Sequence, residues 1–188
     1  LEILAEQTAL PAFSGEWCAI LPRVWRDSDE PQLRAWLAHA KAMGVTAALS
    51  GNLGHLPLLR DSGLTVSGDF GLNVFNSRAL DYLRRKNLAA ACLSFELRFP
   101  QMRDMQKVIP AEAIVYGRLP LMITENCLVQ NETGCRLDRQ GLCVPEDGPC
   151  RCGQPNVLVD RTGAAFPLLP AYGHRTEIQN SKPLYLAD

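Results

Sequence analysis

The stretch Val45-Thr46-Ala47-Ala48-Leu49-Ser50-Gly51-Asn52 decides the fold, because it is a short apolar run that ends in small and polar residues. Such a run, bounded by turn residues, is typical of a strand buried on both faces. Pro31 begins a predicted helix upstream of it, and Gly44 ends that helix. A second apolar run follows at residues 64–67, after a short predicted helix at 53–61. The order of strand, helix and strand predicts parallel βαβ units.

The same cycle repeats along the first 118 residues, where five short apolar runs alternate with four helical stretches. A TIM-type barrel has this alternation but needs eight βα units and about 200–250 residues. We therefore expect an α/β fold, a partial TIM-like (β/α) barrel of about five parallel strands, from a chain that is part of a longer protein. The predicted strands are residues 17–22, 45–49, 64–67, 90–94 and 112–116, and the later predicted helices are 77–86 and 98–108.

Residues 119–188 follow a different pattern. Two apolar segments, residues 156–160 and 165–168, flank the turn at 161–163, which predicts a β-hairpin. Residues 176–186 form a last extended segment. We therefore expect two domains: a half barrel at 1–118, and a cysteine-rich loop with an antiparallel β appendage, packed on the barrel, at 119–188.

The composition excludes an electrostatic argument for a nucleic-acid or membrane partner, because 19 Lys and Arg balance 20 Asp and Glu. No apolar run reaches the roughly 18–20 residues that span a bilayer, and the first ten residues do not look like a signal peptide. The sequence therefore predicts a cytoplasmic protein. In that reducing compartment, clustered cysteines indicate metal binding or catalysis more than disulfides.

Five of the seven cysteines lie within 26 residues of one another. They are Cys127, Cys135, Cys143, Cys150 and Cys152. Their spacing lacks the paired CxxC knuckles of a zinc ribbon and the bacterial ferredoxin run. Three interpretations stay open: a zinc site, an iron–sulfur cluster, or thiols without a metal. His174 follows the predicted hairpin and is a further candidate ligand.

Polar residues recur where the predicted parallel strands end, and in α/β folds these carboxyl ends form the site. Asn and Asp there can instead cap the next helix. A carboxylate or guanidinium beside a buried strand needs a partner or a ligand. The candidate catalytic residues are Asn73, Glu96 and Arg118, and the candidate substrate-binding residues are Asn52, Asp69 and Tyr116.

Hydrolytic motifs are absent from the sequence: there is no HExxH, no GxSxG and no glycine-rich phosphate loop. The spacing of the Cys and His residues in the sequence does not identify a catalytic nucleophile together with its general base. His39 is expected on a solvated helix face, and His55, near a strand end, is expected to be structural more often than functional.

Several ordered motifs resemble peptidase family U32, the collagenase-like peptidases. They are residues 72–77, 93–97, 116–122, the two cysteines at 127 and 135, and residues 158–167 and 180–186. The resemblance implies that this chain is the C-terminal half of a TIM-like barrel with its cysteine-rich segment. Better-understood members of that family resemble oxygen-independent hydroxylases with a four-cysteine iron–sulfur cluster, which act on RNA or a quinone precursor.

By position, the resemblance makes Cys127 and Cys135 the first two cluster ligands and Cys150 or Cys152 the third. His174, before Arg175, stands where the family has its fourth cysteine. This departure leaves zinc and iron–sulfur both open as the cofactor. The fourth thiolate can instead come from Cys143 or from whichever of Cys150 and Cys152 is not the third ligand.

Three functions follow as expectations. The first is a metal- or iron–sulfur-dependent enzyme that hydroxylates RNA or a small molecule. The alternatives are a metal-dependent peptidase of collagenase type and a structural zinc module without catalysis. Unpaired edges of a parallel sheet also predict a homodimer.

Overall fold

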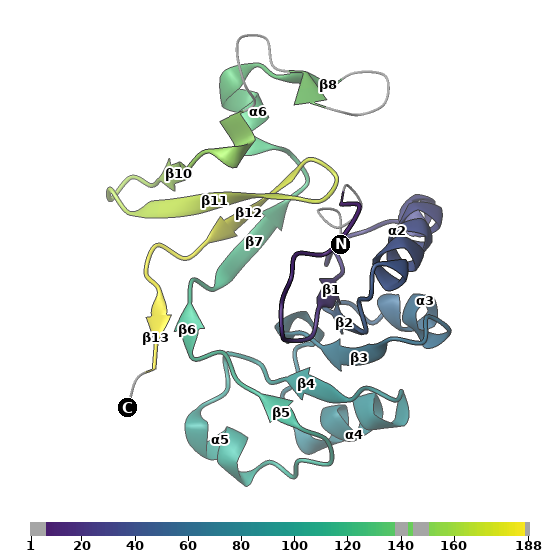
Figure 1. Ribbon diagram of the computed structural model, residues 1–188. Coiled ribbons are helices and arrows are strands. Elements are labelled where there is room, and N and C mark those ends of the chain that lie inside the picture. Colours follow the sequence, from purple (N-terminus) through teal and green to yellow (C-terminus); the bar gives the residue numbers. More distant parts are fainter. Residues whose placement is uncertain (1–6, 138–142, 145–150, 187–188) are drawn as a thin grey trace. The chain divides into compact units, whose positions relative to one another are not determined.

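The computed structural model describes residues 7–137, 143–144 and 151–186, and the chain forms two compact units, Leu1–Ile114 and Val115–Asp188 (Figure 1). We call these units unit 1 and unit 2.

Unit 1 is built on a five-stranded sheet in which every pairing is parallel and the strands follow chain order. This confirms the predicted α/β class and the partial barrel-like arrangement of five parallel strands. The strands are β1 (Cys18–Ile20), β2 (Ala47–Ser50), β3 (Thr65–Gly68), β4 (Ala90–Cys92) and β5 (Ala111–Glu112).

The connections between these strands contain the predicted helices (Figure 1). Each helix begins or ends within a few residues of the position that the sequence indicates. The helices are α2 (Glu30–Ala42), α3 (His55–Arg60), α4 (Ser77–Arg85) and α5 (Phe99–Asp104), with 3-10 turns η1 (Asp27–Asp29) and η2 (Phe70–Leu72).

The core of unit 1 forms because small strand residues face leucines on the helices. Leu33 and Leu37 of α2 are buried against Ala19 of β1 and Ala48 of β2. Gly44 follows the end of α2 and has a φ of +102°, a backbone conformation that favours glycine. A second cluster forms around α4 and β4 in the same way, from Leu80, Leu83, Ala91 and Leu93.

Two strand predictions are wrong in part. Residues 17–22 look fully buried because they are nearly all apolar, yet Ile20 is 58% exposed, since β1 is the terminal strand of the sheet. The predicted fifth strand, 112–116, is split. Its first part is β5, whereas Tyr116 belongs to β6 (Tyr116–Gly117), which pairs antiparallel with β13 (Leu184–Tyr185) in unit 2.

Unit 2 contains a four-stranded antiparallel sheet in the order β10-β11-β12-β7. The predicted hairpin is confirmed by β10 (Asn156–Val159) and β11 (Ala165–Ala171). The last extended segment, 176–186, covers most of β12 (Arg175–Gln179) and contains β13. The remaining elements are β7 (Pro120–Thr124), α6 (Leu128–Thr133), β8 (Arg136–Leu137), β9 (Cys143–Val144) and η3 (Arg151–Gly153).

Asp160 sets the turn of this hairpin. Its Oδ1 atom accepts hydrogen bonds from the Thr162 backbone N–H at 2.8 Å and from the Thr162 hydroxyl at 2.7 Å. These bonds favour the carboxylate form and hold the pKa of Asp160 below its usual value. The Asp-x-Thr-Gly sequence therefore specifies this turn locally.

Candidate functional site

Two of the predicted binding residues lie at the carboxyl edge of the parallel sheet in unit 1. Asn52 follows β2, and its Nδ2 group donates to the Arg23 carbonyl at 3.0 Å while its Oδ1 accepts from the Gly54 N–H at 2.8 Å. Asp69 follows β3 and accepts from the Phe70 N–H at 2.8 Å. Both side chains therefore stand at the edge and also cap local turns.

Arg23 lies at the same edge and was missed by the sequence reasoning. Its guanidinium carbon is 4.8 Å from the centroid of the Phe70 ring, within the range of a cation–π contact. Two glycines leave room for its stem. A Cβ on Gly51 would lie 2.8 Å from Arg23 Cγ, and a Cβ on Gly71 would lie 3.3 Å from Arg23 Cδ. The available signal was its place just after the first strand, where the other strands have polar residues.

The surroundings at this sheet edge shift the pKa values of Asp69 and Cys92. Burial raises the pKa of the Asp69 carboxyl, while the Phe70 N–H and the Arg23 charge oppose the shift. Burial also raises the pKa of the Cys92 thiol to about 11, with smaller contributions from Asp69 and Glu112. Cys92 therefore stays protonated at neutral pH and is a poor nucleophile.

Ser50 and His55 form the nucleophile–base contact that spacing did not reveal, with 3.4 Å between Ser50 Oγ and His55 Nδ1. Both residues are fully buried. Burial lowers the pKa of His55 to about 4, and the Pro22 carbonyl opposes that shift. Among the described residues, His55 Nε2 has no hydrogen-bond partner of good geometry. Neither side chain is open to solvent, and the contact lies in the interior of unit 1.

Asn73 and Glu96 are exposed residues beside the same edge. Asn73 ends η2 with φ +48°, and its N–H donates to the Phe70 carbonyl at 2.9 Å. The loop of Glu96 reaches η2 through a Phe70–Phe95 ring contact of 6.0 Å between centroids. Within the described residues the Glu96 carboxylate makes no hydrogen bond or ion pair. Their catalytic roles stay predictions.

Tyr116 and Arg118 do not end a parallel strand, contrary to expectation. Tyr116 lies in the antiparallel β6–β13 ladder, where its ring meets Tyr185 edge to face at 5.9 Å between centroids. Arg118 donates to the Asn180 carbonyl at 2.8 Å and to the Ser181 carbonyl. The guanidinium therefore holds backbone within unit 2, because the chain leaves the parallel sheet after β5.

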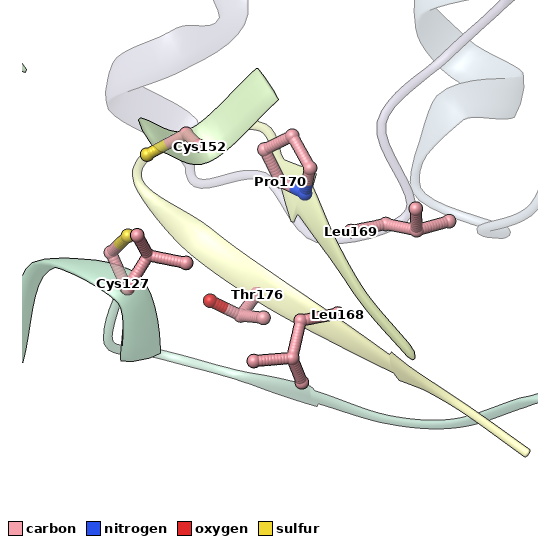
Figure 2. A pocket seen from close by; sticks show the side chains of 7 residues that line it. Cys127, Cys152, Leu168, Leu169, Pro170 and Thr176 are labelled. Atoms are coloured by element: carbon pink, nitrogen blue, oxygen red, sulfur yellow. The ribbon is translucent and has the colours of Figure 1, made fainter. Parts of the chain in front are cut away.

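Cys127 and Cys152 line one pocket of unit 2, although they are far apart in the sequence (Figure 2). Cys127 is 7% exposed and Cys152 is partly exposed. The other lining residues are mainly apolar: Val129, Leu168, Leu169, Pro170 and Thr176. Two thiols in one apolar pocket are a donor pair suited to a soft metal ion.

Cys135 lies at the opposite end of α6 from Cys127 and is also 7% exposed. Gln130 links the two cysteines. Its backbone N–H donates to Cys127 Sγ at 3.4 Å, and its side-chain amide donates to the Cys135 carbonyl at 2.8 Å. The Cys135 thiol is 3.0 Å from the Thr133 hydroxyl. Helix α6, which the sequence reasoning did not predict, therefore sets the position of both cysteines.

The structure gives less information about the other candidate metal ligands, His174, Cys150 and Cys143. His174 has φ +58° in the turn between β11 and β12. Cys150 lies outside the described residues, and Cys143 is described only as backbone of β9. In ranges 7–137 and 151–186 no three His, Cys, Asp or Glu side chains gather as a metal site. The described donors Cys127, Cys135 and Cys152 fit zinc or iron–sulfur in chemical type.

A comparison with protein families gives a match over most of the chain. A family model described as Peptidase family U32 matches residues 16–154, which include the parallel strands of unit 1 and the cysteines from Cys127 to Cys152. No curated protein and no solved structure matches the chain. Among the described residues, the helices are all too short or too polar to cross a membrane.

Proposed function

Since this chain belongs to peptidase family U32, the collagenase-like proteases, we propose that it carries the metal-binding cysteines of an enzyme that hydroxylates RNA or a small molecule without oxygen. The single observation that supports this proposal most is the pocket shared by Cys127 and Cys152. Thiols that the fold brings together from distant positions indicate a ligand that needs both. A reducing compartment such as the cytoplasm, where thiols persist, suits this proposal.

The proposed ligands of the metal group are Cys127, Cys135, Cys150 and Cys152, with His174 as a further donor. An iron–sulfur cluster would supply electron transfer at this site, and zinc would supply Lewis acidity. When a metal is bound, the cysteines would supply thiolate ligands. The other pocket residues supply an apolar lining, and the hydrogen bond from the Leu128 N–H to Thr176 holds the backbone next to Cys127.

The sheet edge of unit 1 supplies the proposed substrate contacts. Arg23 offers a positive charge, with its stem between Gly51 and Gly71, that suits the phosphate or carboxylate of a substrate. Asp69, whose pKa is raised by burial, can hold or release a proton there. Asn52 fixes the backbone of Arg23, and Glu96 adds an exposed carboxylate.

Metal analysis of anaerobically prepared protein tests the proposal. We expect iron with sulfide, or zinc, in the wild-type chain and its loss in Cys127→Ser and Cys135→Ser. Cys92→Ser is the matched control, because Cys92 is a buried thiol of unit 1 and should leave the metal content unchanged. A wild-type protein free of both iron and zinc would overturn the proposal.

A metal-dependent peptidase of collagenase type is the second candidate, favoured by the family to which the chain belongs. Incubation of gelatin with the protein, with and without a chelator, tests it. Peptide cleavage that the chelator abolishes would support this candidate, and intact gelatin under both conditions would remove it.

A structural zinc module is the third candidate, favoured by the hydrogen bonds that tie Thr124 and Leu128, on either side of Cys127, to Thr176 of β12. In that case, chelation should lower the melting temperature of the chain.

A homodimer through the sheet edge is a separate proposal, favoured by Ile20, which is 58% exposed on the terminal strand β1. Sedimentation of the protein at several concentrations tests it, and a monomer throughout would contradict it.

A further inference from the structure

The first two residues of β12 hold the chain on both sides of Cys127. Arg175 donates through Nη2 to Glu125 Oε2 at 3.1 Å, two residues before the cysteine. Thr176 accepts from the Leu128 N–H at 3.0 Å, one residue after it. The placement of Cys127 in its pocket is therefore set by β12, a strand that lies about fifty residues further along the chain.

Arg175 is unusual because its charge is buried. Its side chain is 6% exposed, whereas that of its partner Glu125 is 61% exposed. A second donor, Nη1, bonds to the Tyr172 carbonyl at 3.1 Å. The Nε atom is buried and has no hydrogen-bond partner among the described residues. Burying a guanidinium is costly, and a solvated carboxylate repays little of that cost.

The turn before Arg175 is shaped to accommodate this side chain. Gly173 has φ +73°, and a Cβ at that position would lie only 2.6 Å from Arg175 Nη1. The guanidinium therefore lies against the turn between β11 and β12, where Nη1 bonds to the Tyr172 carbonyl, and its Nη2 atom bonds to Glu125, two residues before Cys127. The Nε atom of Arg175 is a buried donor without an acceptor among the described residues. An ion pair whose only role was to join two strands would not require such a donor.

We propose that Arg175 is a positioning residue for the thiol pocket. It fixes Cys127 through Glu125, and its buried positive charge offsets the negative charge that several thiolates bring when they bind a metal ion. Ligating cysteines must be deprotonated, so a site with three or four thiolates around a divalent ion has a net negative charge. This inference rests on the metal-binding function proposed above for the same cysteines.

Cobalt(II) binding by the full chain under anaerobic conditions tests the inference, with sulfur-to-cobalt absorption as the readout and a competing chelator to measure affinity. We expect Arg175→Met to weaken binding about 10- to 100-fold, as loss of an outer-shell partner typically does. Arg175→Lys, which keeps the charge, should lose less. Glu125→Gln, at an exposed carboxylate, should weaken binding only a few-fold. Arg161→Met, an exposed arginine in the β10–β11 turn, is the control and should bind like wild type.

The melting temperature of each metal-free variant is measured alongside, so that unfolding is not mistaken for weak binding. If Arg175→Met is folded and binds cobalt as tightly as wild type, Arg175 is only structural and the inference is wrong. If Arg175→Met does not fold, Arg175→Lys and Glu125→Gln decide: wild-type affinity in both overturns the inference. If wild type binds no cobalt and, as prepared, contains neither iron nor zinc, the proposed metal-binding function fails and this inference fails with it.

Discussion

The backbone N–H of Leu128 donates a 3.0 Å hydrogen bond to the hydroxyl of Thr176, and this bond joins the start of α6 to β12 across 48 positions of sequence. Thr124, opposite Thr176 in the sheet, donates to the Asn126 carbonyl at 2.6 Å. Together these threonines fix the corner that presents Cys127.

Replacing Thr176 by valine tests this corner, because valine keeps the shape and removes the acceptor. Thr176 is 2% exposed, so the Leu128 N–H loses its partner in a buried setting. We expect the free energy of unfolding to fall by about 1–3 kcal/mol. Thr65→Val, at an exposed position of β3, is the control. Equal denaturation midpoints for the two variants would contradict the role given to Thr176.

Gly71 and Gly51 should differ in their response to alanine. A Cβ on Gly71 would lie 2.5 Å from the Gly51 carbonyl oxygen, a backbone atom, whereas a Cβ on Gly51 meets first the flexible stem of Arg23. Gly71→Ala should therefore cost about 1–3 kcal/mol of stability, as overpacking does, and Gly51→Ala should cost less. Urea denaturation measures both, and the reverse order would show that this edge is not close-packed.

Asn76 should stabilise α4 through its cap. Its Oδ1 accepts from the Ala79 N–H at 3.0 Å, and Asn76→Ala should lower stability by about 1 kcal/mol. Asn76→Asp keeps an acceptor at the same position and should retain most of that stability. Thermal unfolding followed by circular dichroism distinguishes them, and the cap has no role if both variants melt with wild type.

His55 should make the protein less stable in acid. Its pKa is 6.5 in the unfolded chain and about 4 in the folded one, because burial disfavours the charged imidazole. A lowered folded pKa means that the unfolded state binds the proton first, so stability present above pH 6.5 is lost as pH falls toward 4. The loss approaches about 3 kcal/mol below pH 4.

His55→Gln should remove this part of the pH dependence, whereas His39→Gln, a histidine that is not fully buried, should retain it. The measurement is the difference in unfolding free energy between each variant and wild type, taken at several pH values from neutral to 4. A difference for His55→Gln that stays constant with pH would contradict the prediction.

The local pattern of the chain was sufficient for most elements of unit 1. Apolar runs of four or five residues, one-faced helices and stop glycines such as Gly44 act over a few residues, so they specify strands and helices before any long-range contact forms. Their alternation leaves parallel pairing as the consistent topology. Asn52 and Asp69 were found for the same reason, since the carboxyl end of a strand is a position in the sequence.

Tertiary contacts decided the rest. The apolar run at 112–116 reads as one strand, and only pairing with Tyr185 draws Tyr116 away from the parallel sheet. Arg23 acquires its place from Gly51 and Gly71, which belong to two later loops.

Tertiary contacts also decide how the cysteines are grouped. Their number indicated a metal, but which of them share a pocket depends on chain segments that meet only in the folded state, as Cys127 and Cys152 do. The buried charge of Arg175 is invisible in the sequence, because burial is a property of what surrounds a residue and not of the residue itself. Sequence therefore determined most elements of unit 1 and the kinds of donor available, and tertiary packing decided which donors meet.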